Sequence, residues 1–149
     1  MTRPPTPRPQ AVLFACRFNS VRSPMAAALL RAQHPGDIYA RSAGVRKQDL
    51  DSFATAAMAE AGIDISGHVP VTFQELDDWE GLNFDLIVTL SPEAHHRALD
   101  LTRTDAAEVE YWPTPDPTAA EGTRDQRLAA YREVRDYLAQ RIRERFGTP

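Results

Sequence analysis

The chain contains 149 residues, 42% of them hydrophobic, which is typical of one domain with a hydrophobic core. Its formal net charge of −4 gives no electrostatic reason to expect a nucleic acid or an anionic membrane as partner. No apolar run approaches the ~20 residues of a membrane span, no signal-peptide segment is visible, and the one cysteine excludes an internal disulfide. We therefore expect a cytoplasmic protein. We expect no cofactor and no metal, because no Cys/His cluster has zinc-ligand spacing.

Residues 1–10 carry four prolines, at positions 4, 5, 7 and 9. Proline lacks an amide hydrogen and has a fixed φ, so this stretch is incompatible with a helix or an interior strand. We predict a disordered, proline-rich tail here and one folded domain over residues 11–149. The domain begins with the apolar run Ala11 to Ala15, which predicts a buried strand, and a loop from Cys16 to Arg22 follows.

The rest of the chain alternates between helix and strand patterns. Ser23 is expected to cap the first helix, with Pro24 in its first turn, and a Pro-Gly pair after His34 ends it. A strand over 38–43 comes next, then a helix from Asp51 or Ser52 to the stop at Gly62, and a loop over 63–71. A short helix over 73–79, a strand over 84–90 and a helix from 91 or 92 to 101 follow. The last elements are a weaker strand over 108–112, a stiff proline loop over 113–117, and a helix that starts at a Thr123–Gln126 capping box and ends at Gly147.

Apolar strands that alternate with helices predict an α/β fold, with a parallel sheet covered by helices on both faces. Such sheets bind ligands beyond the carboxyl ends of their strands. Cys16 follows the first predicted strand and Asp116 follows the last. We therefore expect that the two side chains can meet at one edge of the sheet.

The loop from Cys16 to Arg22 has the pattern of an oxyanion site. It joins a buried strand to a helix N-terminus, where backbone N–H groups point at one spot and favour negative charge. A cysteine there is favoured as the thiolate, and Arg22 offers a planar fork that can bind two phosphate oxygens. Ser23 can donate a hydrogen bond to the Cys16 sulfur, and Asn19 tolerates the left-handed backbone that a tight loop requires. The alternative, a cysteine that is only a small buried hydrophobe, fits the mostly polar residues after Cys16 less well.

Asp116 allows two interpretations. An acid on a proline-stiffened loop at a strand end can be positioned for proton transfer. An aspartate before a proline is also a common turn residue. The residues alone leave the two interpretations open.

The segment from Cys16 to Ala26, CRFNSVRSPMA, resembles the phosphate loop of the low-molecular-weight protein tyrosine phosphatase family, which includes thioredoxin-type arsenate reductases. The resemblance continues in family order with Ser42-Ala43-Gly44, Gly62 to Ser66 with His68, residues 84–90 and the Asp116-Pro117 pair. It covers nearly the whole chain from residue 11. It implies a three-layer fold whose four-stranded parallel sheet has the order 2-1-3-4, with helices on both faces.

The resemblance also implies roles. Cys16 would be the nucleophile, Arg22 the phosphate-binding arginine, and Asp116 the general acid and then the base. The phosphate-binding residues would be Arg17, Phe18, Asn19, Ser20, Val21, Arg22 and Ser23, and the residues that support the loop would be Asn19, Ser23, Ser42 and His68.

Four features depart from the family pattern. Phe18 stands where a glycine is usual, and a left-handed backbone at phenylalanine would cost about 1–2 kcal/mol. Thr118-Ala119-Ala120 replaces the tyrosines that follow the Asp-Pro pair in eukaryotic-type members, and Arg17 replaces a frequent apolar residue. Val21 stands where many members have a second cysteine.

Three functions follow in order of preference. The first is a phosphomonoester hydrolase that acts through a cysteinyl-phosphate intermediate on a phosphorylated protein or a small phosphomonoester. The second is an arsenate reductase that uses an external thiol, because the chain has no further cysteine for an internal disulfide relay. The third is a non-catalytic module that binds oxyanions or phosphoproteins, which Phe18 brings into consideration.

Overall fold

The computed structural model describes residues 8–102 and 107–147. Its elements in chain order are β1 (Ala11–Cys16), α1 (Arg22–Gln33), β2 (Tyr39–Gly44), α2 (Ser52–Glu60), α3 (Phe73–Glu80), β3 (Leu86–Thr89), α4 (Pro92–Leu101), β4 (Glu108–Tyr111), the 3-10 helix η1 (Pro117–Ala119) and α5 (Arg124–Phe146). No helix in these ranges is both long enough and apolar enough to cross a membrane.

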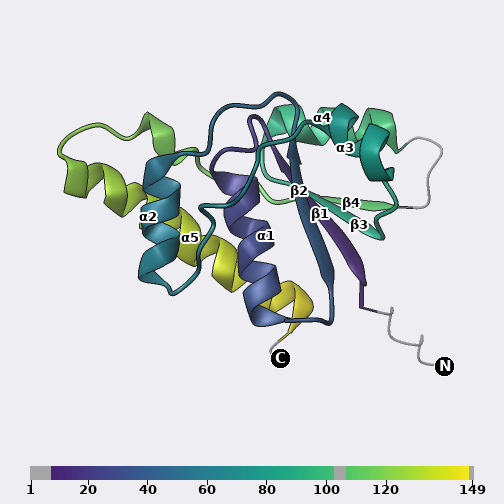
Figure 1. Ribbon diagram of the computed structural model, residues 1–149, viewed down its shortest axis with the longest axis horizontal. Helices are drawn as coiled ribbons and strands as arrows, with labels where there is room; N and C mark the ends of the chain where they lie inside the picture. Colours follow the sequence, from purple (N-terminus) through teal and green to yellow (C-terminus); the bar gives the residue numbers. More distant parts are fainter. Residues whose placement is uncertain (1–7, 103–106, 148–149) are drawn as a thin grey trace.

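The four strands form one parallel sheet in the order β2-β1-β3-β4 (Figure 1). The predicted α/β class and strand order are confirmed. The third and fourth strands are shorter than predicted. Leu90 still donates its N–H to the Ala15 carbonyl, 2.8 Å away, but the chain then turns because Ser91 caps α4.

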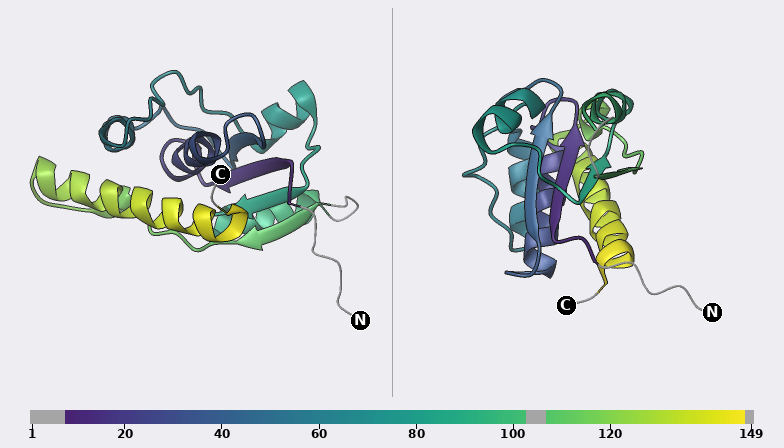
Figure 2. Two further views of the ribbon diagram at one scale, coloured as in Figure 1. Left: turned by 90° about the horizontal axis from the view of Figure 1, so that it is seen from below. Right: turned by 90° about the vertical axis from the view of Figure 1, so that its right-hand side faces the viewer.

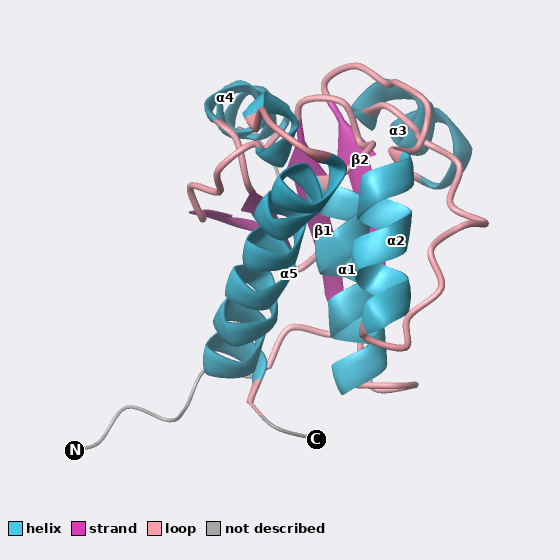
Figure 3. Ribbon diagram, turned by 90° about the vertical axis from the view of Figure 1, so that its left-hand side faces the viewer, coloured by secondary structure: helices cyan, strands magenta, loops and turns pink. Residues whose placement is uncertain are grey.

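Strand β1 lies at the centre of the fold and separates two hydrophobic clusters. Val12 and Phe14 pack with α1, α2 and α5, whereas Leu13 and Ala15 pack with α3 and α4, as the alternation of side chains along a strand requires. Figure 3 shows α1, α2 and α5 on the same side of the sheet, and the two views of Figure 2 show the layers from other directions. The carboxyl end of β1 therefore opens between two helical layers.

The predicted disordered tail remains a prediction, because residues 1–7 lie outside the described residues. In the described part, the N–H groups of Gln10 and Ala11 donate to Asp85 Oδ2 at 2.8 and 3.0 Å. These bonds fix the start of β1 to the loop before β3.

The helix starts are encoded locally, with one exception. Asp51 accepts from the N–H groups of Phe53 and Ala54 and caps α2 as predicted, and Thr123 forms the predicted capping box of α5. The cap predicted for Ser23 is wrong: α1 already begins at Arg22, and no side chain caps it. Ser23 lies inside the first turn, and its hydroxyl contacts the Cys16 sulfur instead.

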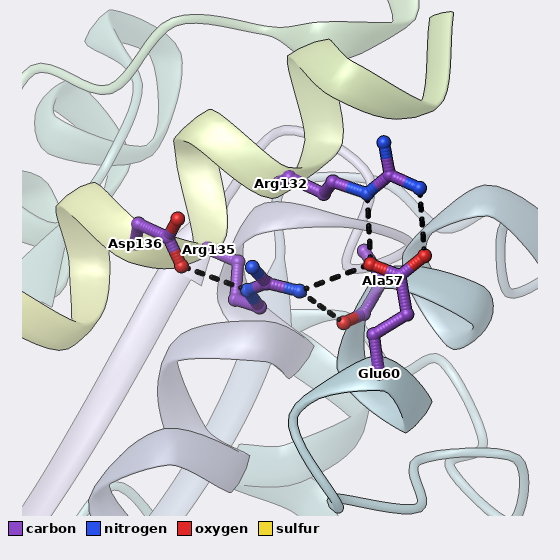
Figure 4. A network of polar contacts seen from close by, with 5 residues as sticks. All are labelled: Ala57, Glu60, Arg132, Arg135 and Asp136. Atoms are coloured by element: carbon purple, nitrogen blue, oxygen red, sulfur yellow. Dashed lines mark hydrogen bonds and ion pairs between the residues drawn. The ribbon is translucent and has the colours of Figure 1, made fainter. Parts of the chain in front are cut away.

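Helix α2 is fastened to α5 by an ionic cluster (Figure 4). Glu60 accepts two hydrogen bonds from Arg132, both at 2.8 Å. Arg135 donates to the Ala57 carbonyl at 2.7 Å and contacts Asp136 at 2.9 Å. The Arg132–Glu60 pair is more than a third exposed, so water and salt screen it and it contributes little to the free energy of folding. Its consequence is positional, since it holds α2, and the loop that leads into α2, against the long helix α5.

Candidate active site

A narrow cleft of about 150 Å³ lies at the carboxyl end of β1. Its lining comes from three segments: the loop after β1, the segment before α2 and the loop before α5. The lining residues are Cys16, Phe18, Ser20, Val21, Arg22, Gln48, Asp49, Asp51, Asp116 and Thr118. The structure thus brings Cys16, Arg22 and Asp116 together, although almost a hundred residues separate the first two from the third.

The loop from Cys16 to Arg22 turns its carbonyl groups outward. The carbonyls of residues 16, 17, 18 and 20 accept from the N–H groups of residues 45, 46, 48 and 51, at 2.8 to 3.2 Å. Among the described residues, the N–H groups of residues 17–21 have no acceptor. Carbonyls that are bound on the outside leave the N–H groups for the inside, which is the arrangement of an anion-binding nest. No local sequence pattern indicates that the segment 45–51 packs along the loop and donates to its carbonyls.

Asn19 holds this loop from within. It has φ 55° and is the one non-glycine residue of the described chain in the left-handed region. Its side-chain Nδ2 donates to Ser23 Oγ at 2.8 Å and to Ser42 Oγ at 2.9 Å. Its Oδ1 accepts from the Val71 N–H at 2.9 Å. The fully buried amide therefore connects α1, β2 and the segment before α3.

His68 contacts Asn19 from the loop between α2 and α3. Its Nε2 lies 3.2 Å from both the backbone oxygen and Oδ1 of Asn19. Both of these atoms are acceptors, so the ring carries its proton on Nε2. Burial is the largest cause that lowers the pKa of His68, while the hydrogen bond to Asn19 raises it. The neutral ring thus donates to the loop at neutral pH.

The Cys16 sulfur is 2% exposed and lies 2.9 Å from Ser23 Oγ. Ser23 Oγ already accepts from Asn19, so its own hydrogen can be donated to the sulfur at 2.9 Å or to the Ala43 carbonyl at 3.5 Å, and the shorter contact favours the sulfur. A hydroxyl donor stabilises a thiolate more than a thiol. The geometry therefore suits a sulfur that carries negative charge, either as attacking nucleophile or as leaving group.

Arg22 is buried at the first position of α1, and its Nη1 donates to the Thr114 carbonyl at 3.0 Å. This bond orients the guanidinium beside the cleft and ties the loop after β1 to the loop that carries Asp116.

Gly44, at the end of β2, packs closely against the backbone of the loop from Cys16 to Arg22. A Cβ on Gly44 would lie 2.8 Å from the Asn19 nitrogen, so the end of β2 can approach the loop only without a side chain.

Phe18 does not carry the strain that its position suggested. The left-handed residue is its neighbour Asn19. The Phe18 ring lines the cleft, and the Arg17 guanidinium lies 4.7 Å from the ring centroid. Arg17 also pairs with Glu93 at 3.1 Å. Phe18 therefore forms part of the cleft without a left-handed backbone, whereas Arg17, predicted to bind phosphate, packs on the Phe18 ring and is not among the lining residues.

Asp116 is an exposed residue at the N-cap of η1. Its Oδ1 accepts from the Thr118 N–H at 3.0 Å and from the Thr118 hydroxyl at 2.7 Å. These bonds leave Oδ2 as the oxygen that described residues do not engage. Thr118 thus orients the carboxyl group. No signal in the sequence pointed to this contact.

The opposite wall of the cleft is also anchored. Tyr131 on α5 donates its hydroxyl to Asp51 Oδ2 at 2.8 Å. Burial, followed by this hydrogen bond, raises the pKa of Tyr131, so the phenol stays protonated. The Phe53 ring stacks on Tyr131 with centroids 5.3 Å apart. Sequence reasoning identified Asp51 only as a helix cap and missed its place in the cleft wall.

Comparison with known proteins agrees with this geometry. The family model for low molecular weight phosphotyrosine protein phosphatase matches residues 11–146. The chain belongs to this family. An arsenate reductase of Bacillus licheniformis is 36% identical over 135 residues, which cover 90% of this chain and 93% of that protein.

Solved structures of the family show the same fold. An arsenate reductase from Archaeoglobus fulgidus has 29% identity and a TM-score of 0.68, over 91% of this chain and 98% of that one. The tyrosine phosphatase Wzb from Escherichia coli K30, solved with sulphate, has 20% identity and a TM-score of 0.73, over 91% and 94% of the two chains. The second likeness concerns the fold alone. Family membership thus makes this a cysteine-dependent enzyme of the phosphatase and arsenate reductase type.

Proposed function

We propose that this protein is a phosphomonoester hydrolase that acts through a cysteinyl-phosphate intermediate. One observation carries the proposal: Cys16, Arg22 and Asp116 line one cleft, around a loop whose N–H groups are left without acceptors among the described residues. The substrate is a phosphorylated protein or a small phosphomonoester in the cytoplasm. No metal or cofactor enters the reaction.

In the first step the Cys16 thiolate attacks phosphorus in line with the leaving oxygen. The P–O bond breaks as the S–P bond forms, and the protonated Asp116 carboxyl gives its proton to the departing oxygen. The equatorial oxygens stay bound to the loop N–H groups and to Arg22, which stabilise the charge in the transition state. Proton transfer from a positioned acid contributes about 10²–10⁴ in rate.

In the second step water attacks the phosphorus and the S–P bond breaks. The Asp116 carboxylate takes a proton from the water, and inorganic phosphate is released. The electron pair of the bond returns to the Cys16 sulfur, where the Ser23 hydroxyl, 2.9 Å away, stabilises the thiolate. One loop thus serves both steps.

Hydrolysis of an aryl phosphate in the presence of EDTA tests the nucleophile. We expect wild type to be active and Cys16→Ser to be inactive, with Ser52→Ala as a matched control outside the cleft. Equal hydrolysis rates for wild type and Cys16→Ser would rule out Cys16 as the nucleophile. Asp116→Asn should slow phosphoryl transfer to Cys16, most strongly for substrates with poor leaving groups. A decrease in rate that does not depend on the leaving group would rule out Asp116 as the general acid.

The second candidate is arsenate reduction with an external thiol, favoured by the name of the 36% identical relative. Arsenate would condense with the Cys16 thiol and release water. An external thiol would then attack the Cys16 sulfur. The S–As bond breaks, its electron pair reduces arsenic to arsenite, and a mixed disulfide remains. A second external thiol restores Cys16, so two thiols become one disulfide.

Both reactions can be measured on one preparation. The hydrolase proposal expects aryl phosphate turnover without thiol and little arsenate-dependent thiol consumption. The opposite result would make the protein an external-thiol reductase. Phosphate binding without either turnover would indicate the non-catalytic module. The strain at Phe18 that brought this third candidate into consideration is absent.

A further inference from the structure

A second, larger cavity lies behind the phosphate loop. It has a volume of about 480 Å³ and is enclosed by α1, β2, the loop over 61–71 and α3. The polar and aromatic residues that matter below are Arg31, Arg41, Ser42, Asp64, His68 and Trp79. We call it the back cavity. Its volume lies within the range of ~300–1,000 Å³ that is typical of small-molecule sites.

The back cavity carries an excess of donors from arginine. Arg31 donates Nε and Nη2 to the Ala40 carbonyl at 3.2 and 2.9 Å. Among the described residues it has no ion-pair partner. Arg41 Nε lies 3.2 Å from Glu80 Oε1, yet it is buried without the alignment of a hydrogen bond. Both guanidinium groups therefore keep N–H donors for a further acceptor.

These charges act on one another. Burial is the largest cause that lowers the pKa of Arg31, and the charge of Arg41 lowers it further. The same two arginines contribute to the lowered pKa of His68, after burial. The positive charges of Arg31 and Arg41 therefore act on the same region of the cavity, where the Glu80 carboxylate, 3.2 Å from Arg41 Nε, offsets part of the Arg41 charge.

The one carboxylate that lines the cavity, Asp64, pairs with neither arginine. Asp64 Oδ1 accepts from the Ser66 N–H at 2.8 Å. Hydrogen bonds from Ser66 lower the pKa of Asp64, and no arginine contributes to this shift. Asp64 is therefore turned toward its own loop rather than toward Arg31 or Arg41.

The rim of the back cavity is apolar and aromatic. Trp79 is 65% exposed and Val69 is 73% exposed, and both line the cavity. A large exposed indole next to guanidinium groups with spare N–H donors suits a ligand with a planar ring and an anionic group. The volume of 480 Å³ also exceeds what an inorganic ion needs.

We propose that the back cavity binds a small aromatic oxyanion, with its anionic group between Arg31 and Arg41 and its ring against Trp79. This occupant would contact the support of the nucleophile. His68 lines the cavity and donates to Asn19, Asn19 donates to Ser23, and Ser23 contacts Cys16. The site is distinct from the catalytic cleft, because the two share no lining residue.

Binding can be followed by NMR on the full-length wild-type chain, independently of any catalytic activity. The protein has two tryptophans, so their indole N–H signals report separately on the back cavity and on buried Trp112. Benzenesulfonate and inorganic sulfate serve as probes, since neither is a phosphomonoester. We expect benzenesulfonate to shift the Trp79 signal saturably and to bind more tightly than sulfate.

Variants test which groups hold the probe. Arg31→Gln and Arg41→Gln should each raise the Kd for benzenesulfonate at least about tenfold, whereas Arg97→Gln, an exposed arginine on α4, should leave it unchanged. If an arginine variant does not fold, Trp79→Ala provides a second test, because it should reduce benzenesulfonate affinity to that of sulfate; there Kd is read from backbone amide shifts.

Three results would overturn the proposal. The first is a Trp79 signal that does not move, or movement confined to Trp112. The second is an unchanged Kd in folded Arg31→Gln and Arg41→Gln proteins. The third is equal affinity for benzenesulfonate and sulfate in wild type.

Discussion

Replacement of Asn19 by alanine should strongly destabilise the protein. The asparagine side chain takes part in four hydrogen bonds, with Ser23, Ser42, His68 and Val71. At about 1 kcal/mol for each bond the loss is roughly 4 kcal/mol. The left-handed backbone at φ 55° adds about 1 kcal/mol for a residue with a Cβ and no polar side chain. The sum is a large part of the ~5–15 kcal/mol by which proteins of this size are stable.

Urea unfolding measures this loss. With an m-value of about 2 kcal/mol/M, Asn19→Ala should lower the midpoint by roughly 2.5 M. Asn19→Gly loses the same side-chain contacts but tolerates positive φ. We therefore expect the glycine variant to be at least as stable as the alanine variant, the reverse of their order at helical positions. A midpoint for Asn19→Ala within about 0.5 M of wild type would refute the central role of this side chain.

Three further predictions follow from the same contacts. Thr118→Val should lower kcat about fivefold without a change in KM, because it removes one of the two donors that orient Asp116, a fraction of the ~10²–10⁴ that a general acid supplies. The unfolding free energy should fall from about pH 7.5 to about pH 5.5, because the folded state lowers the pKa of His68 and the unfolded chain binds that proton first; His68→Gln should flatten the profile in urea titrations. Gly44→Ala should destabilise by about 2–3 kcal/mol, since its Cβ would lie 2.8 Å from the Asn19 nitrogen.

Each of these predictions has a contrary outcome. An unchanged kcat in Thr118→Val would mean that the hydroxyl does not orient the acid. A pH profile as steep in His68→Gln as in wild type would assign the acid sensitivity to other groups. A Gly44→Ala protein of wild-type stability would show that the end of β2 can move away from the loop.

The fold was largely predictable because its signals are local. Asp51 caps α2 and Thr123 with Gln126 caps α5, and such caps depend on residues only two or three positions apart. The apolar runs at 11–15 and 84–90 predicted central strands, and the structure has strands at both places. The strand order, in contrast, came from the family resemblance.

The candidate site was predictable only where one segment carries it. The loop from Cys16 to Arg22 is contiguous, so its residues could be named from the sequence. Tyr131 and Asp51 lie 80 positions apart in the sequence, and no local sequence pattern indicates that they are in contact. Ser23 was predicted wrongly because a serine near a helix start can either cap the helix or bind a tertiary partner. The position of the Cys16 sulfur, which the local sequence does not reveal, decides between the two.

Helix α5 is bonded to the segments on both sides of the catalytic cleft. Tyr131 holds Asp51 on one wall, and Tyr137, less than two turns further along the same helix, donates to the Pro113 carbonyl at 3.1 Å in the loop of the other wall. The segments on the two sides of the cleft are therefore both positioned by contacts with one rigid helix. Loss of either phenol hydroxyl would release one of these segments from the helix, so α5 couples the positions of the two walls.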